Sequence, residues 1–251
     1  LEVMKRAGEA EMVRLVDYKW RGLQRLRQNL GDQQIDYHQH GGYELFMAGD
    51  TGQAATCVAQ IDRLNILLRP VTGSPVVYEP ADQKINAFGF NGVGRMIFNK
   101  FEGQLHTGKM MLALLHKVYQ TGTLVLNSCA VQAIRQEGAH ISIDSNQGFF
   151  KAHKVILATN AFARQLFPQL QVAPGRGQVL VTRPVPGLKL KGTYHFNQGY
   201  YYFRNIDGRI LFGGGRNIDI KAEETFEFGC TTAVQQQLAH YLRAVILRGQ
   251  P

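Results

Sequence analysis

The sequence contains little cysteine and no long apolar run. Its three cysteines, Cys57, Cys129 and Cys230, are widely separated and form neither a C-x-x-C pair nor a cysteine–histidine ligand spacing. This pattern argues against a disulfide framework and a zinc site, and it predicts a reducing, cytoplasmic location. No apolar stretch approaches the length of about 20 residues that a membrane-spanning helix needs. We therefore expect no membrane span.

Several catalytic motifs are also absent. The chain has no G-x-S-x-G nucleophile turn and no H-E-x-x-H zinc helix, so the common serine hydrolases and zinc proteases do not fit. Glu223 and Glu224 are adjacent and would point apart in a strand or helix, which makes them a poor acid–base pair. His38 and His40 would share one face of a strand, but no third ligand lies nearby, so we predict no metal site.

A complete glycine-rich phosphate-binding turn is missing as well. Such a turn, G-x-G-x-x-G between a strand and a helix, holds the pyrophosphate of a dinucleotide on backbone N–H groups. Three glycine clusters approach this pattern, but each lacks the third glycine and the strand-to-helix context. They begin at Gly92, Gly175 and Gly213.

The composition is typical of a folded protein. Of the 251 residues, 45% are hydrophobic and 19% are charged, which is enough to bury a core in one large domain or two intertwined ones. The net charge of +9 at pH 7 raises the alternative of a non-catalytic binding module for an anionic partner such as nucleic acid. Because the lysine and arginine residues are scattered and form no block, we favour a solvated basic surface and expect no nucleic-acid partner.

Apolar periodicity predicts several helices and many short strands. Apolar residues recur at three- and four-residue steps from Glu2 to Leu30, and Gly31 follows as a helix stop. Similar patterns predict helices at residues 51–69, 107–119, 161–166 and 231–247. Alternating apolar residues between turn residues predict strands. The expected strands are residues 34–40, 42–48, 75–78, 124–126, 130–134, 140–143, 155–157, 178–182, 193–196, 200–204 and 209–213.

Three blocks between residues 153 and 216 carry the most specific pattern. The first, HKVILATNAFA, predicts a buried strand that ends in a tight turn; the second is VAPGRGQVLVTRPVPG and the third is GYYYFRNIDGRILFGGGRNID. In the third block, Tyr200, Tyr202 and Arg204 occupy alternate positions, so they would project from one face of their strand. Two phenols and one guanidinium on the same surface could bind a carboxylate.

In this order and at this spacing, the three blocks resemble the FAD-dependent oxidoreductases of the D-amino-acid oxidase and glycine oxidase type. The resemblance implies a mixed α/β (α+β) fold, in which an antiparallel substrate-binding sheet with helices adjoins part of a glutathione-reductase-like FAD domain. It assigns residues 1–104 and 175–251 to the substrate-binding part. Residues 105–174 would form the central strands and helix of the FAD domain, without its N-terminal G-x-G-x-x-G unit.

The resemblance also implies an activity. Enzymes of this type oxidise the C–N bond of an amine or amino acid by hydride transfer to FAD, so we expect a small-molecule amine or amino acid as substrate. The chain begins with Leu1 rather than Met, and it has no counterpart of the family's C-terminal segment. We therefore expect a fragment that is inactive alone, and its uncovered flavin-side surface predicts self-association.

Finally, the resemblance assigns roles to individual residues. Ala158, Thr159 and Asn160 match a turn in which the family has Ala-Thr-Gly beside the cofactor, and Val131 matches a position that meets the adenine end of FAD. Gly177 matches the start of a strand that enters the substrate sheet. A plain core position for Val131 and a simple turn at Gly177 are the alternatives. The implied catalytic, substrate-shaping residues are Tyr200, Tyr202 and Arg204, with ordinary aromatic packing as the alternative.

Overall fold

A computed structural model describes residues 1–248, which form two compact units. Unit 1 contains Leu1–His116, Gln178–Ile218 and the chain from Cys230 onward, and unit 2 contains Lys117–Gly177 and Asp219–Gly229. Each unit is thus assembled from segments that are distant in the sequence. The substrate-binding and FAD-binding roles expected for parts of the chain stay predictions, and residues 249–251 of the expected substrate-binding part lie outside the described residues.

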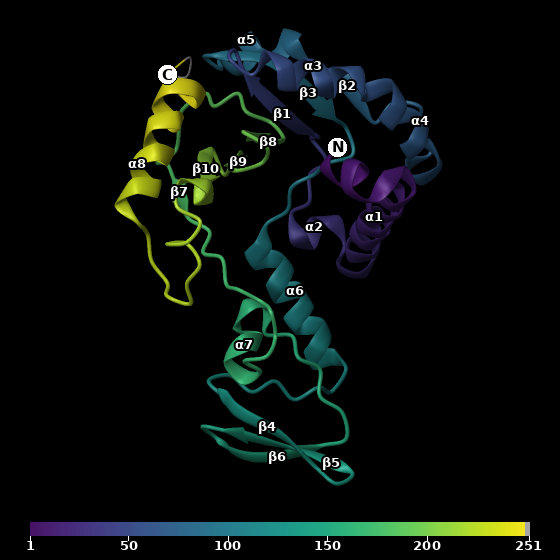
Figure 1. The fold of residues 1–251 in the computed structure, drawn as a ribbon, viewed down its shortest axis with the longest axis vertical. Coiled ribbons are helices and arrows are strands. Elements are labelled where there is room, and N and C mark those ends of the chain that lie inside the picture. The colour runs from purple at the N-terminus through teal and green to yellow at the C-terminus, as the bar shows by residue number, and fades with distance from the viewer. Residues whose placement is uncertain (249–251) are drawn as a thin grey trace. The chain divides into compact units, whose positions relative to one another are not determined.

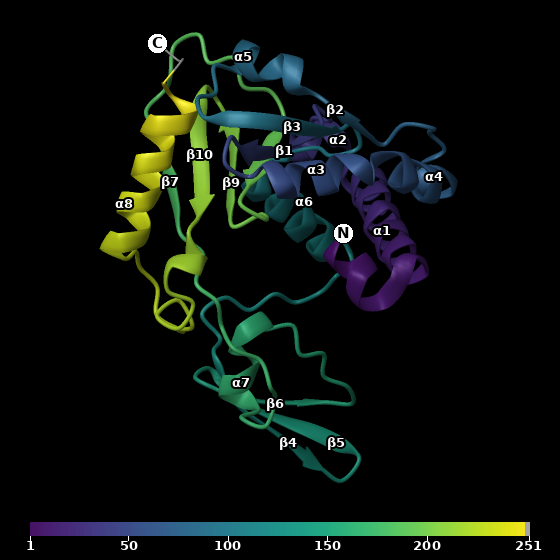
Figure 2. The same ribbon diagram turned by 45° about the horizontal axis from the view of Figure 1, so that its top comes forward.

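Unit 1 is built on one seven-stranded sheet (Figures 1 and 2). The strand order is β2-β3-β1-β8-β9-β10-β7, and all neighbouring strands are antiparallel except β1 and β8. This confirms the predicted mixed α/β fold with an antiparallel sheet and helices. The strands are β1 Gly42–Met47, β2 Tyr78–Pro80, β3 Val93–Asn99, β7 Val179–Val181, β8 Thr193–Phe196, β9 Tyr201–Ile206 and β10 Arg209–Gly214.

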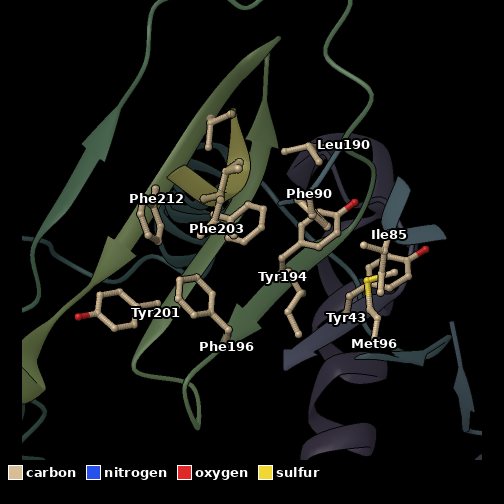
Figure 3. Close-up of a cluster of buried hydrophobic side chains, with 14 of the residues drawn as sticks. Tyr43, Ile85, Phe90, Met96, Leu190, Tyr194, Phe196, Tyr201, Phe203 and Phe212 are labelled. Atoms are coloured by element: carbon tan, nitrogen blue, oxygen red, sulfur yellow. The ribbon is translucent and has the colours of Figure 1, made fainter. Parts of the chain in front are cut away.

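One face of this sheet carries an aromatic core (Figure 3). Tyr201 and Phe203 of β9 are buried in it, because alternate residues of a strand point to the same face. The ring of Phe203 stacks on that of Tyr194, with 4.7 Å between the centroids, and Tyr194 stacks on Tyr43 at 5.1 Å. Such aromatic pairs contribute about 0.5–1.5 kcal/mol each beyond the burial of their area. The core therefore ties β1, β8 and β9 together.

Helix α8, Thr232–Tyr241, covers the aromatic core together with the π-helical turn Leu242–Ile246 that follows it. Its apolar residues Val234 and Leu238 lie one helical turn apart and are both buried. The helix predicted for residues 231–247 is thus confirmed, with a wider last turn.

Two helices replace the single helix predicted for residues 51–69. They are α3, Thr51–Ala59, and α4, Ile61–Thr72, and Gln60 separates them. Pro70 lies inside the last turn of α4 rather than after the helix. The break at Gln60 lets both helices contribute to one apolar cluster with β1 and β3. Its buried members are Phe46, Ala54, Ile61 and Ile97.

Helix α1, Glu2–Leu30, confirms the first predicted helix and its stop at Gly31. Gly8 interrupts it with a backbone φ of 83°, a conformation that glycine adopts without steric cost. Trp20, the only tryptophan of the sequence, packs edge-on against Phe101 with 5.2 Å between ring centroids. Within residues 1–248, no helix is long and apolar enough to cross a membrane.

The strand predicted for residues 34–40 is wrong. Helix α2, Asp32–Ile35, occupies its first two residues, and Ile35 is fully buried. Asp36 follows in the left-handed conformation, with φ of 54°, and ends the helix. His38 then forms only an isolated bridge with Gln104. A left-handed residue and local burial outweigh the alternating pattern here.

Residues 70–90, for which only a strand at residues 75–78 is predicted, contain more structure than expected. Strand β2 begins where the strand predicted at residues 75–78 should end, and a short 3-10 turn, Asp82–Lys84, leads into helix α5, Ile85–Phe88. Strand β3, which begins beside the glycine cluster at Gly92, is not among the predicted strands. Its pairing with both β1 and β2 stabilises it.

Unit 2 contains a three-stranded antiparallel sheet in the order β4-β5-β6. Strands β4, Val131–Glu137, and β5, His140–Ser145, confirm two predicted strands, and β6, Gly148–Ala152, extends the hairpin. The boundary between the units falls within helix α6, Thr107–Gln120, which confirms another predicted helix. A 3-10 turn and the short helix α7, Ala163–Leu166, follow near the expected position.

Two strands predicted in unit 2 are wrong. Residues 155–157 form no strand, and Ile156 is 91% exposed rather than buried. Residues 124–126 are likewise irregular, and Leu124 is exposed. An apolar run becomes a buried strand only where a neighbouring strand satisfies its backbone groups, and no described strand pairs with either run.

Candidate functional site

The face of the seven-stranded sheet opposite the aromatic core, here called the open face, carries a row of polar side chains. The strand register places Glu44 of β1 opposite His195 of β8, His195 opposite Tyr202 of β9, and Tyr202 opposite Gly213 of β10. Directly opposed residues on one face lie about 4.5–5.5 Å apart at Cβ and interact. We call Glu44, His195 and Tyr202 the polar row.

An ion pair joins the first two members of the polar row. His195 Nδ1 lies 2.6 Å from Glu44 Oε2, and both side chains are partly buried. Burial lowers the pKa of His195, but its hydrogen bond to Glu44 and the charges of Glu44 and Glu102 outweigh burial and leave the pKa raised. The other ring nitrogen, Nε2, has no hydrogen-bond partner among residues 1–248. The imidazole is therefore oriented through one nitrogen and available at the other.

Glu102 places a second carboxylate on the open face. Its oxygens accept hydrogen bonds from Asn99 Nδ2 at 3.1 Å and from Thr193 Oγ1 at 3.2 Å. A Cβ added to Gly42 would lie 1.8 Å from Glu102 Oε2, so the absence of a side chain at Gly42 makes room for this carboxylate. Residues of the sheet thus hold the Glu102 carboxylate in place.

A cavity of about 920 Å³ lies above this part of the open face. Its lining includes Glu44, Glu102 and His195 from the sheet region, Cys57 from α3 and Lys5 from α1. Burial raises the pKa of the Cys57 thiol, and the nearby charge of Glu44 raises it further, which does not favour a reactive thiolate. The cavity is large enough for a small organic molecule.

Tyr200, Tyr202 and Arg204 project from the open face, as their alternation predicts, while the residues between them are buried. Tyr200 is 42% exposed and lines the large cavity. Tyr202 is 43% exposed, and its ring lies over Gly213, where an added Cβ would be 2.7 Å from the Tyr202 ring and hydroxyl. The two tyrosines are accessible, whereas their neighbours hold the core.

Arg204 lies in a different hollow. Its Nη1 donates a hydrogen bond to the Leu105 carbonyl at 2.8 Å, and burial lowers the pKa of the guanidinium although Asp207 and Asp36 raise it. The surrounding cavity has a volume of about 330 Å³. The structure therefore brings Arg204 onto the same face as Tyr200 and Tyr202 but not into the same cavity. Other basic groups lining the small cavity are His38, His40, His106 and Lys191.

The predicted cofactor contacts all lie in unit 2. Ala158, Thr159 and Asn160 are exposed where an irregular segment enters the 3-10 turn Asn160–Phe162, and Asn160 has the left-handed φ of 51° that its predicted place in a tight turn requires. Val131 begins β4 and is 39% exposed, so the alternative of a plain core position is wrong. Gly177 is exposed, and a Cβ added to it would meet nothing within 4 Å.

A buried ion pair in unit 2 was not predicted. Glu223, with 2% of its side chain exposed, accepts two hydrogen bonds of 2.9 Å from Arg176 Nε and Nη2. Bidentate pairs of this kind are specific in geometry as well as strong. Glu223 is thus engaged with Arg176, and no local pattern indicates this pair, because the two residues lie 47 positions apart.

His38 and His40 do lie together, with stacked rings 5.4 Å apart. His38 is hydrogen-bonded to Asp36 at 3.0 Å. In the part of the chain that the structure describes, no group of three or more histidine, cysteine or acidic residues could hold a metal ion.

Comparison with known proteins places the chain in a family. The sequence model of the family described as FAD dependent oxidoreductase matches residues 3–249. The chain therefore belongs to the FAD-dependent oxidoreductase family, whose cofactor is FAD, and the predicted resemblance is confirmed.

Curated relatives match over shorter stretches. The bifunctional protein ThiO/ThiG of Synechocystis sp. is 28% identical over 116 residues, which are 45% of this chain and 18% of that protein. The protein of the same name from Trichormus variabilis is 35% identical over 83 residues, which are 32% of this chain and 12% of that protein. This chain thus matches less than a fifth of the length of either relative.

Solved structures share the fold at low sequence identity. Iminodiacetate oxidase from Chelativorans sp. BNC1 superposes with a TM-score of 0.72 at 15% identity, covering 96% of this chain and 65% of that chain. L-proline dehydrogenase from P. horikoshii gives a TM-score of 0.70 at 18% identity, covering 90% of this chain and 62% of that chain. Glycine oxidase from Geobacillus kaustophilus gives a TM-score of 0.65 at 17% identity, covering 93% of this chain and 62% of that chain. The chain spans somewhat less than two thirds of each.

Proposed function

We propose that this protein takes part in the oxidation of the C–N bond of an amine or amino acid by hydride transfer to FAD. The observation that carries the proposal is the polar row, which lies on a sheet of this oxidoreductase fold and two of whose members, Glu44 and His195, line a cavity of about 920 Å³. A small amine or amino acid is the expected partner.

In this proposal the open face is the substrate side. Tyr200 and Tyr202 supply hydroxyl groups and accessible ring faces, which can hold a small polar molecule by hydrogen bonds and packing. Arg204 contributes a positive charge from the smaller cavity, where its guanidinium already donates a hydrogen bond to a backbone carbonyl. The catalytic assignment of these three residues rests on the resemblance and on their shared strand face.

FAD, when bound, accepts the hydride and so supplies the redox chemistry. The described residues fit this cofactor in unit 2, where Ala158, Thr159 and Asn160 are exposed and Asn160 has the left-handed backbone of a tight turn. We propose that these residues, with Val131 and Gly177, hold it. The 251 residues contain no G-x-G-x-x-G turn for the pyrophosphate, so we expect weak binding of FAD by this chain, and the titration has to reach an excess of FAD.

The alternative of an anion-binding module gains no support from the charges. Several basic side chains of α1 are paired with acidic neighbours, among them Arg14 with Glu11 and Arg21 with Asp17. Such paired charges form no continuous basic patch for a phosphate backbone. A cytoplasmic location, the fragment character of the chain and its self-association stay predictions.

The experiment that tests the proposed function is a flavin titration followed by substrate reduction. The protein is titrated with FAD, its visible absorbance is recorded, and amines and amino acids are added without oxygen. Loss of the oxidised flavin bands on adding an amine is the expected result. Bound flavin that no amine or amino acid reduces would refute the proposal.

Variants then test the substrate side. Tyr202→Phe should slow flavin reduction, and Arg204→Met should do the same if the guanidinium contributes to substrate binding. Tyr18→Phe is the matched control, because Tyr18 is an exposed tyrosine on α1. If the substrate reduces flavin as fast in the Tyr202→Phe and Arg204→Met variants as in Tyr18→Phe, the assignment of these two residues to the substrate site is wrong.

A further inference from the structure

The Glu44–His195 pair has the geometry of an oriented base. A carboxylate that hydrogen-bonds one imidazole nitrogen fixes the orientation of the ring and leaves the other nitrogen to exchange a proton. His195 Nδ1 is engaged by Glu44 at 2.6 Å, and Nε2 is without a hydrogen-bond partner among residues 1–248. The pair therefore has the two parts that proton transfer needs.

Its place on the sheet gives the pair access to a bound molecule. His195 lines the large cavity, and the next member of the polar row is Tyr202, on the neighbouring strand. The backbone holds this arrangement, because β1 and β8 form the parallel pair at the centre of the sheet. A molecule bound over Tyr202 would thus lie beside the imidazole.

The reaction proposed above creates a need for such a group. An amine carries a positive charge at neutral pH, and its nitrogen must lose a proton before its lone pair can assist departure of the hydride from the adjacent carbon. The structure offers His195 as the only imidazole that lines this cavity among the described residues.

We propose that His195 is the proton acceptor for the substrate ammonium group, positioned by Glu44. This proposal rests on the proposed function. An N–H bond of the ammonium breaks, the proton moves to His195 Nε2, and the nitrogen keeps its lone pair. With that lone pair free, bound FAD would take a hydride from the adjacent carbon and the substrate would become an iminium ion, while the imidazole keeps the proton. Glu44 keeps its charge and stabilises the imidazolium, which makes it a positioning residue.

The first arm of the test needs no flavin. The protein is labelled at its histidine side chains, and benzylamine and sarcosine are titrated in while the imidazole signals are followed by NMR. The His195 signal should move on addition of at least one probe, whereas that of His116, an exposed histidine on α6, should stay in place. A His195 signal that neither probe moves would overturn the proposal.

The second arm follows flavin reduction against pH in flavin-loaded protein. The rate in the wild type should rise with pH as His195 becomes neutral. His195→Gln should remove this rise and slow reduction by about 100-fold or more, the usual contribution of a general base. Glu44→Gln should shift the rise to lower pH, because it removes the charge that favours the imidazolium. His116→Gln is the matched control and should preserve the wild-type profile.

Several other groups surround His195, and the pH profile has to be assigned among them. They are Glu44 on β1, Tyr202 on β9, Glu102 after β3, Tyr200 before β9, Cys57 on α3, Tyr78 on β2, Glu2, Lys5 and Arg6 on α1, and the amino group of Leu1. Only a rise that disappears in His195→Gln and moves in Glu44→Gln supports the proposal. A rise that persists unchanged in both variants would overturn it.

The two arms separate failure of this proposal from failure of the proposed function. If no amine reduces the flavin of the wild type, the proposed function fails and the NMR arm alone decides whether His195 meets the amine. If flavin is reduced and His195→Gln retains the wild-type rate, the oxidase function stands and His195 is not its base. If His195→Gln does not fold, Glu44→Gln and the wild-type NMR titration still decide.

Discussion

The neighbouring glycines Gly213 and Gly214 should respond very differently to the same small change. A Cβ at Gly213 would lie 2.7 Å from the ring and hydroxyl of Tyr202, whose side chain is accessible and can swing away. A Cβ at Gly214 would lie 2.0 Å from the Tyr200 carbonyl oxygen and 2.8 Å from Tyr201 Cα, which are backbone atoms, and Gly214 has a φ of 125°. The first clash can relax within one side chain, whereas the second strains the hairpin itself.

The expected magnitudes follow from these contacts. In Gly213→Ala, the gain of about 0.5–1 kcal/mol from removing a flexible glycine from a strand offsets much of the cost of displacing the tyrosine, so we expect stability within about 1 kcal/mol of wild type. In Gly214→Ala, a left-handed side chain costs about 1–2 kcal/mol, and overpacking adds about 1–3 kcal/mol. We therefore expect a loss of about 2–5 kcal/mol.

Urea unfolding followed by far-UV circular dichroism measures both free energies of unfolding. NMR of labelled tyrosine rings, assigned with Tyr202→Phe, reports whether Tyr202 moves in Gly213→Ala. The reasoning is refuted if both substitutions cost the same free energy. It is also refuted if the Tyr202 ring signals of Gly213→Ala match those of the wild type.

Three further predictions concern charge and packing. Because the folded pKa of His195 is raised above its unfolded value of about 6.5, its pairing with Glu44 stabilises the fold below pH 6.5, and this stabilisation is lost as pH rises through the folded pKa. The difference in free energy of unfolding between wild type and Glu44→Gln, measured by urea titration, should therefore shrink as the pH rises through the folded pKa of His195. A difference that grows with pH would contradict this stabilising role of the pair. Arg176→Met removes the bidentate partner of the buried Glu223 carboxylate and should destabilise unit 2 by about 3–5 kcal/mol, as measured by hydrogen exchange of β4–β6. The double variant Arg176→Met with Glu223→Leu should restore much of the lost stability. Equal losses in the single and the double variant would contradict the role of this ion pair. Phe212→Ala, at a fully buried position, should lower the free energy of unfolding by about 3–5 kcal/mol, and a loss below about 1 kcal/mol would show that the core is not packed around this ring.

The sequence predicts the parts of the fold whose pattern is local. The helix over Glu2–Leu30 is periodic throughout and ends at a glycine, and the hairpin of β9 and β10 combines alternation with a two-residue turn at Asp207 and Gly208. Each carries its own signal in its own residues. The shared face of Tyr200, Tyr202 and Arg204 follows from the same alternation.

Contacts between distant segments could not be predicted in this way. Glu44 and His195 are 151 positions apart, and only the parallel pairing of β1 with β8 brings them together. The division of Tyr200 and Arg204 between two cavities depends on how the segment containing Leu105 packs against the sheet. At residues 155–157 the local pattern is misleading. The apolar composition is that of a buried strand, but no described strand pairs with this run.

The single tryptophan has a practical consequence for every unfolding measurement on this protein. Trp20 and its ring partner Phe101 both belong to unit 1, and unit 2 contains no tryptophan. Intrinsic tryptophan fluorescence is therefore a reporter of unit 1, whereas circular dichroism sums the signals of both units. If the two probes give different midpoints in one titration, the units unfold independently; coincident midpoints would identify one cooperative transition.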